Sequence, residues 1–289
     1  MSLGWVYVIL ILEQVLASGT FLAAKWALAE FPPLTLAFLR FIIASAGLYL
    51  IHRLWPGRRP IDRDDRKMFV LLGFLAVVIN QGFFLYGLKF TTPTHAALLY
   101  GATPVLVFLF AIPLIGEKAT LLKKIGVPVT FLGVATVIIH AGMDWSFKAL
   151  FGDILILCAV GAWALFTVLG KRLVAKYGAI HLTAMSIIFG TFLFAPIGLV
   201  TFTRFDPDVI TARGWSSLAY IAIGTSVIAY SIWFWALSRL EATKVSVFNN
   251  LQPIFTAIMS FFLLDETIGP RLIVGGILVI VGVILTERG

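Results

Sequence analysis

The stretch PVLVFLFAIPLIGEKATLLKKIGVPVTFLG, residues 104–133, decides the fold because the chain contains a second copy of it. The copy, PIFTAIMSFFLLDETIGPRLIVGGILVIVG at residues 253–282, repeats its proline, its acidic turn and its spaced glycines. Every matched pair is separated by 149 residues, as 253 minus 104 gives. The pairs are Pro104 and Pro253, Glu117 and Glu266, Gly126 and Gly275, and Gly133 and Gly282. Four matches of uncommon residue types in one ungapped register indicate an internal duplication.

Weaker matches extend the same register toward the N-terminal side of each copy. They are Tyr86 with Trp235, Leu88 with Leu237, and Thr94 with Thr243. The duplication is therefore not confined to two helices. We predict two repeats, residues 1–140 and residues 151–286.

The composition is typical of a membrane protein. Of the 289 residues, 60% are hydrophobic and only 12% are charged, and the mean hydropathy is +1.01. Apolar runs of about 20 residues recur, the length that crosses a bilayer core as a helix. The net charge of +8 would suggest nucleic acid as a partner for a soluble protein, but Lys and Arg also hold loops in the cytoplasm. We expect a lipid bilayer as the surroundings and no nucleic-acid partner.

Two features of the sequence limit other possibilities. Cys158 is the single cysteine and lies in an apolar segment, so we expect neither an intrachain disulfide nor a metal or other cofactor site. No Lys or Arg precedes the first apolar run. We therefore interpret that run as an uncleaved membrane span rather than a signal peptide.

We predict an all-α polytopic membrane protein with ten transmembrane helices. Turn and boundary signals separate the apolar runs at Pro32-Pro33, Pro56-Gly57, Pro93 and Gly269-Pro270. The expected spans are residues 4–29, 33–54, 67–89, 93–115, 120–140, 151–171, 180–202, 214–239, 243–264 and 268–286.

The distribution of Lys and Arg predicts the orientation of these spans. With the N-terminus inside, cytoplasmic loops hold about 15 of these residues and outer loops about 5, so both termini should be cytoplasmic. Each repeat then has five spans, an odd number, and the second repeat enters the membrane from the opposite side. Inverted repeats of this kind occur in many secondary transporters, with the binding site between the repeats near the membrane midplane.

Polar residues deep in the spans indicate a central cavity, because an unpartnered polar group in hydrocarbon costs roughly 1–3 kcal/mol or more. In the ninth span, Asn249 and Gln252 fall at helical spacing with Thr256, and Tyr100 is the counterpart of Asn249 in the first repeat. A direct helix contact without a cavity would explain Asn249 equally well. The expected cavity residues are Gln14, Ser18, Asn80, Phe84, Tyr100, Trp163, Thr167, Tyr230, Trp233, Asn249 and Gln252.

Pro104 and Pro253 are hinge candidates. A proline has no N–H, so the carbonyl four residues earlier lacks its usual helical partner, and those carbonyls belong to Tyr100 and Asn249. A fixed kink that never moves is the alternative.

Two charged residues lie deep in the apolar spans. Glu13 is about nine residues into the first span, roughly 14 Å from its start, and Arg40 lies within the second. Intramembrane charges are functional candidates by default, so Glu13 is a candidate proton-coupling site. A structural Glu13–Arg40 ion pair is the alternative.

Glu117 and Glu266 occupy equivalent turns between helices. A carboxylate there would stabilise the N-terminus of the helix that follows. We expect this structural role rather than a gating role.

The duplicated pattern of proline, acidic turn and spaced glycines resembles the signature of EamA-type members of the drug/metabolite transporter superfamily. Tyr86-Gly-Leu and Trp235-Ala-Leu resemble its upstream part, and Arg40 resembles an arginine common in the second span. The resemblance implies ten helices around a cavity that opens to one side at a time. The deep aromatic residues and basic loops are further similar to those of bacterial exporters of aromatic amino acids.

The leading hypothesis is a bacterial inner-membrane exporter of small organic metabolites, most of all aromatic or neutral amino acids. Trp163, Tyr100 or Phe84 would stack on the substrate, and amide side chains would hold its polar end. A carrier of another substrate of the superfamily, such as a drug or a purine, and a facilitating channel are alternatives. The sequence lacks H-E-x-x-H and G-x-S-x-G motifs, so a membrane enzyme is not expected.

Overall fold

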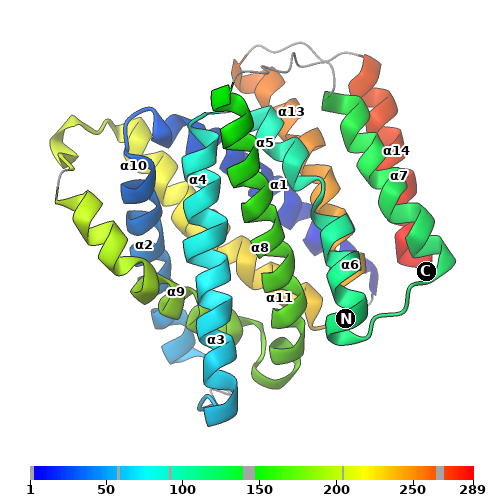
Figure 1. Cartoon of the computed structure of the whole chain (residues 1–289), viewed down its shortest axis with the longest axis horizontal. Helices are drawn as coiled ribbons and strands as arrows, with labels where there is room; N and C mark the ends of the chain where they lie inside the picture. The colour runs from blue at the N-terminus through cyan, green and yellow to red at the C-terminus, as the bar shows by residue number, and fades with distance from the viewer. Residues whose placement is uncertain (1–2, 57–58, 91–92, 139–146, 204, 265–269) are drawn as a thin grey trace.

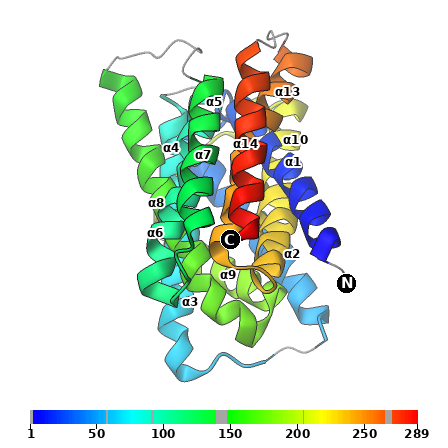
Figure 2. The same cartoon turned by 90° about the vertical axis from the view of Figure 1, so that its right-hand side faces the viewer.

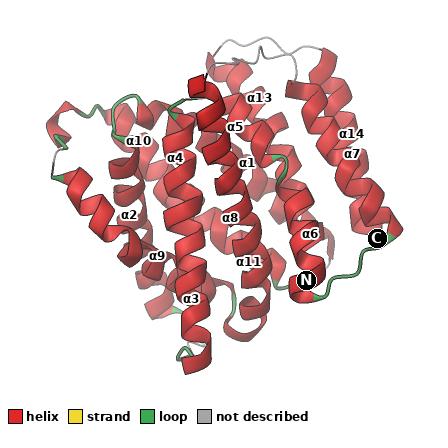
Figure 3. Ribbon diagram, viewed as in Figure 1, coloured by secondary structure: helices red, strands yellow, loops and turns green. Residues whose placement is uncertain are grey.

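The computed structural model describes residues 3–56, 59–90, 93–138, 147–203, 205–264 and 270–289, and in these residues helices joined by loops and turns make up the whole structure (Figures 1 and 3). Asp265 and Glu266 of the second acidic turn lie outside the described residues. The helices of the first half are α1 (Leu3–Leu28), α2 (Pro33–Leu54), η1 (Arg63–Asp65), α3 (Arg66–Gly73), η2 (Phe74–Gln81), α4 (Gly82–Leu88), α5 (Pro93–Tyr100), α6 (Thr103–Ile115) and α7 (Leu121–Ile138). Those of the second half are α8 (Phe147–Tyr177), α9 (Ala179–Phe202), η3 (Pro207–Val209), α10 (Ala212–Ala219), η4 (Tyr220–Ala229), α11 (Tyr230–Leu237), α12 (Ala242–Ser246), η5 (Val247–Leu251), α13 (Gln252–Leu264) and α14 (Pro270–Arg288).

Seven helical segments of the described chain are long and apolar enough to cross a bilayer. They are Leu3–Leu28, Pro33–Leu54, Arg63–Leu88, Leu150–Tyr177, Ala179–Phe202, Ala212–Leu237 and Ala242–Leu263. Their many exposed aliphatic and aromatic side chains suit contact with lipid tails. The other expected spans coincide with α5 and α6, with α7 and with α14, which are not among the seven. The total of ten spans thus stays a prediction.

The two glycine-spaced helices of the repeats, α7 and α14, pack against each other in opposite directions (Figures 1 and 2). A Cβ atom on Gly126, early in α7, would lie 2.8 Å from the carbonyl oxygen of Gly282, late in α14. A Cβ atom on Gly133 would lie 2.8 Å from the carbonyl oxygen of Gly275. Only glycine permits backbones this close.

The second helix of each half, α2 and α9, also run antiparallel to each other. Ser45 and Thr191 share a hydrogen bond of 2.8 Å near the middle of the contact. His52, late in α2, lies 2.9 Å from His181, early in α9. Gly198, late in α9, lies against Phe38, early in α2. Two pairs of corresponding helices therefore meet head to tail.

Among the described residues, each half contains one stretch of π-helix, in which the backbone winds with about one extra residue per turn. These stretches are η2 between α3 and α4, and η4 between α10 and α11. The winding allows adjacent residues to share a face, because the angle between successive side chains is smaller than in an α-helix. Such π-turns are frequently found at functional sites.

Both hinge candidates lie in the first turn of a helix that follows an interruption. Pro104 is the second residue of α6, which follows a turn at residues 101–102, and Pro253 is the second residue of α13, which follows the 3₁₀ segment η5. Proline is tolerated there because the first N–H groups of a helix have no helical acceptor. The expectation of an unpaired Asn249 carbonyl is wrong, since the backbone N–H of Gln252 donates to it. The 3₁₀ winding supplies this nearer donor.

The two ends of the chain lie at the same end of the bundle. The Tyr7 hydroxyl, early in α1, donates to the Glu287 carboxylate, late in α14, over 2.6 Å. The contact joins the first and last helices of the described chain.

Candidate functional site

A cavity of about 60 Å³ lies between helices of both halves. It is lined by Glu13, Ala17, Thr20, Phe21, Arg40, Asn80, Gln81, Phe84, Tyr100, Trp163, Thr225, Ala229, Tyr230, Asn249 and Gln252. Pockets that hold drug-sized ligands measure roughly 300–1,000 Å³. The surrounding helices must therefore move apart before a metabolite can enter.

Aromatic side chains form two walls of the cavity. Phe21, Phe84 and Tyr100 meet edge to face, with ring centroids 5.6–5.8 Å apart. Trp163 faces Tyr230 at 4.9 Å. Aromatic faces and edges of this kind favour a planar or apolar ligand group.

Arg40 organises one polar cluster on the cavity wall. Its side chain is fully buried, Nε donates to the Ser226 hydroxyl over 2.9 Å, and Nη1 donates to the Gln81 amide oxygen. The Gln81 amide nitrogen in turn donates to Tyr230 over 3.0 Å and to Asn80. Asn80 completes the chain by donating to the Tyr100 hydroxyl over 2.9 Å. These bonds fix the orientation of the guanidinium.

Glu13 belongs to a second polar cluster, formed by α1 with η5 and α13. Gln14 donates to the Glu13 carboxylate, and Gln252 donates to the Gln14 amide oxygen over 2.8 Å. The Asn249 amide oxygen lies 3.5 Å from the Gln252 nitrogen. Glu13 is only 4% exposed, so the carboxylate is held inside the protein. The alternative of a Glu13–Arg40 ion pair is wrong, because each side chain has its own partners and no ion pair of the described residues joins them.

The predicted cavity residues fall into two groups. Asn80, Phe84, Tyr100, Trp163, Tyr230, Asn249 and Gln252 line the cavity itself. The other four are buried but do not line it: the Ser18 hydroxyl donates to the Gln14 carbonyl, and the Trp233 indole donates to the Thr167 hydroxyl over 3.2 Å. Trp233 also packs against Trp163 at 5.7 Å. This second group supports the positions of the first.

Sequence reasoning missed six lining residues, namely Ala17, Thr20, Phe21, Gln81, Thr225 and Ala229. One signal was available: the repeat offset applied to Tyr230 gives Gln81. Asn80 and Gln81 are adjacent residues of the π-helical segment η2, and both line the cavity. Ala17 and Ala229 carry no polar atom in their side chains that could have marked them.

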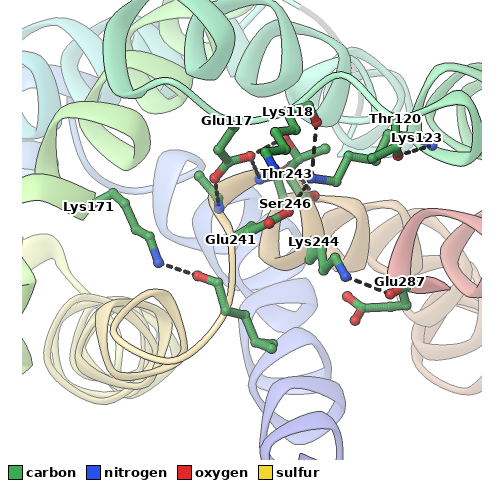
Figure 4. A network of polar contacts seen from close by, with 12 residues as sticks. Glu117, Lys118, Thr120, Lys123, Lys171, Glu241, Thr243, Lys244, Ser246 and Glu287 are labelled. Carbon is green, nitrogen blue, oxygen red and sulfur yellow. Dashed lines mark hydrogen bonds and ion pairs between the residues drawn. The ribbon is translucent and has the colours of Figure 1, made fainter. Parts of the chain in front are cut away.

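A network of charged side chains joins the two halves at one end of the bundle (Figure 4). The Glu117 carboxylate accepts hydrogen bonds from the Ala242 and Thr243 backbone N–H groups and from the Thr243 hydroxyl, the last over 2.7 Å. It thereby caps α12, not α7, the helix that follows it in sequence, so that detail of the expected capping role is wrong. The turn at Gly116, with φ of 71°, directs the acidic residue away from its own helix.

Lysines complete the network on both sides of α12. Lys123 forms an ion pair with Glu241, and Lys244 donates to the Glu287 carbonyl over 2.7 Å. Lys171 donates to the carbonyls of Leu237 and Leu240 at the end of α11. Charge and dipole thus reinforce each other, since cations stabilise helix C-termini and anions stabilise N-termini. Because η5 and α13 follow directly after α12, this network anchors the segment that carries Asn249 and Gln252.

Comparison with known proteins identifies the family to which this architecture belongs. The model of the EamA-like transporter family matches the chain twice, at residues 4–139 and 150–288. A transporter from Archaeoglobus fulgidus is 33% identical over 97% of this chain and 96% of its own length. The transporter YyaM of Bacillus subtilis is 29% identical over 98% of this chain and 93% of its own.

More distant similarity covers most of the chain. The WAT1-related protein At3g18200 of Arabidopsis thaliana is 27% identical over 80% of this chain and 67% of its own length. A solved crystal structure with 19% identity superposes with a TM-score of 0.80 over 99% of this chain and 98% of that one, which shows a shared fold. The chain is thus a multi-pass membrane transporter and belongs to the EamA-like transporter family.

Proposed function

We propose that this transporter exports small metabolites, in the first place aromatic and neutral amino acids, across the bacterial inner membrane by alternating access. The observation that carries the proposal is the cavity itself. Both halves contribute to its lining, and it combines aromatic rings with amide and charged groups. An amino acid has the matching division into a side chain and a polar head.

The proposed motion rests on two inverted repeats, residues 1–140 and 151–286, that make ten spans. The antiparallel packing of α7 with α14 and of α2 with α9 supports this arrangement, because corresponding helices run in opposite directions when one copy is inverted. The double match of the family model to the two halves supports the duplication. The contact between Tyr7 and Glu287 supports an orientation with both termini on one side, which we propose is the cytoplasm.

In this proposal Trp163, Tyr100 and Phe84 contact the substrate side chain, and Asn80, Asn249 and Gln252 contact its polar end. Gln14, Ser18, Thr167 and Trp233 hold these residues in place from behind. Pro104 and Pro253 mark the points where the fourth and ninth spans bend as the halves rock.

Transport by purified protein in liposomes tests the proposal. Uptake of a panel of radiolabelled amino acids is measured with and without an imposed proton gradient. Saturable uptake that unlabelled aromatic amino acids compete away supports an amino-acid carrier. Flux that rises linearly with concentration would favour a channel, and saturable uptake of purines or drugs alone would assign the cavity to another substrate class.

A further inference from the structure

The cavity contains an acid and a base that are not paired with each other. Among its described lining residues, Glu13 is the one carboxylic acid and Arg40 the one guanidinium. They come from different helices, α1 and α2, and belong to separate hydrogen-bond clusters. Buried charges are costly to retain unless each meets an opposite charge or a set of dipoles. Two separated charges in one cavity therefore require an explanation.

The Arg40 guanidinium has N–H donors that its own hydrogen-bond network does not use. Nε and Nη1 have partners in Ser226 and Gln81, whereas Nη2 has no hydrogen-bond partner among the described residues although the side chain is fully buried. A guanidinium offers its donors in a planar fork that matches the two oxygens of a carboxylate. Its fixed position and unused donors suit an incoming carboxylate.

The Glu13 carboxylate can accept further hydrogen bonds. The only hydrogen bond to its carboxylate from the described residues comes from the Gln14 amide, which leaves lone pairs for further donors. An ammonium group offers three N–H donors and a full positive charge. Asn249, which also lines the cavity, has an amide nitrogen without a partner.

We infer that the cavity recognises the zwitterionic head of a free amino acid, with Arg40 binding the carboxylate and Glu13 binding the ammonium group. The inference rests on the proposed amino-acid transport and assigns the charges that make it selective. Binding a zwitterion pairs both buried charges at once and leaves the site neutral. A ligand with only one of the two groups leaves the other charge unpaired, which sites of this type reject strongly.

Equilibrium binding to the detergent-purified protein tests the assignment. The probes are L-phenylalanine, 3-phenylpropanoate, which lacks the amino group, and 2-phenylethylamine, which lacks the carboxylate. We expect the wild type to bind L-phenylalanine at least about tenfold tighter than either analogue. Glu13→Gln abolishes the preference over 3-phenylpropanoate, and Arg40→Gln abolishes the preference over 2-phenylethylamine.

Controls separate these effects from loss of folding and from loss of the proposed function. Lys89→Gln removes an exposed charge outside the cavity and should keep both wild-type ratios. If Arg40→Gln does not give a monodisperse protein, Arg40→Lys replaces it in the test. This variant should bind L-phenylalanine more weakly, because it loses the planar fork of the guanidinium. Wild-type ratios in both glutamine variants of a protein that transports L-phenylalanine would overturn this inference alone. A wild type that binds none of the probes and transports no amino acid would overturn the proposed function with it.

Discussion

Gln81 donates a hydrogen bond to Tyr230 over 3.0 Å, and the two residues are separated by 149 positions, the offset of the internal duplication. A residue can touch its own counterpart only where the two copies meet at the axis that relates them. That contact lies on the wall of the cavity. Under the proposed duplication, the candidate site lies where the two copies face each other.

Tyr230→Phe tests the energetic role of this contact. The substitution leaves the Gln81 amide with one donor unpaired in a buried site, so we expect the variant to lose about 1–3 kcal/mol of stability. Thermal unfolding in detergent measures the loss. In Gln81→Ala the Tyr230 hydroxyl has already lost its bond to Gln81, so adding Tyr230→Phe should cost less than it does alone. Tyr86→Phe, at an exposed ring, is the matched control, and additive effects of the first two changes would contradict the coupling.

Gly282→Ala should destabilise the contact between α7 and α14. A Cβ atom there would lie 2.6 Å from the Thr130 backbone nitrogen and 2.8 Å from the Gly126 carbonyl oxygen, so the helices would have to separate. We expect a loss of about 1–3 kcal/mol, seen as a lower melting temperature. Gly276→Ala on the same helix is the control, because its Cβ atom would meet nothing nearer than 3.8 Å. Equal melting temperatures for the two variants would disprove the close packing.

Glu117→Ala should loosen the end of the bundle where it caps α12. Loss of a cap costs about 0.5–2 kcal/mol, and a loss of 1.4 kcal/mol corresponds to tenfold in the opening equilibrium. With Ser246→Cys as a buried reporter and Cys158→Ser as background, labelling by a membrane-impermeant maleimide should accelerate by about tenfold. Asp64→Asn, at an exposed acidic residue, controls for the loss of charge. Unchanged labelling in Glu117→Ala would show that the cap does not hold this end closed.

Trp163→Ala should impair recognition of aromatic substrates selectively. The ring lines the cavity and contacts Tyr230, so its loss removes an apolar face of the cavity. We expect KM for L-phenylalanine to rise roughly tenfold, with a smaller change for L-alanine, in liposome uptake. Trp5→Ala, at a 60% exposed indole, should leave both values unaltered. An equal rise for the two amino acids would assign Trp163 to packing alone.

The sequence predicted the helices better than it predicted the contacts between them. The expected span 33–54 coincides with α2, because two prolines and a charged loop bound an uninterrupted apolar run. Asn80 and Tyr230 were found from their type and depth, since polar groups at the membrane midplane need partners. Gln81, which neighbours Asn80 in the π-helical segment η2, was not predicted to line the cavity.

Long-range partners were the hardest to predict. Glu117 caps α12 because a left-handed glycine turns it toward the other half of the molecule, and nothing in its immediate neighbours specifies that direction. In the same way, the depth of Glu13 and Arg40 showed that each needs partners but not that those partners would be different amides. Periodicity specifies which face of a helix is buried; the neighbour that covers it depends on the tertiary arrangement.

The π-turns in η2 and η4 also constrain how the chain can change its length. Removing one residue from residues 74–81 would turn everything beyond the deletion by up to about 100°, the angle that one residue contributes to a helix. The Phe84 side chain would then point away from the cavity into the surrounding bundle. Its position would no longer match the winding of the other half. Insertions and deletions in this lineage should therefore concentrate in the loops, while these two segments vary only by substitution.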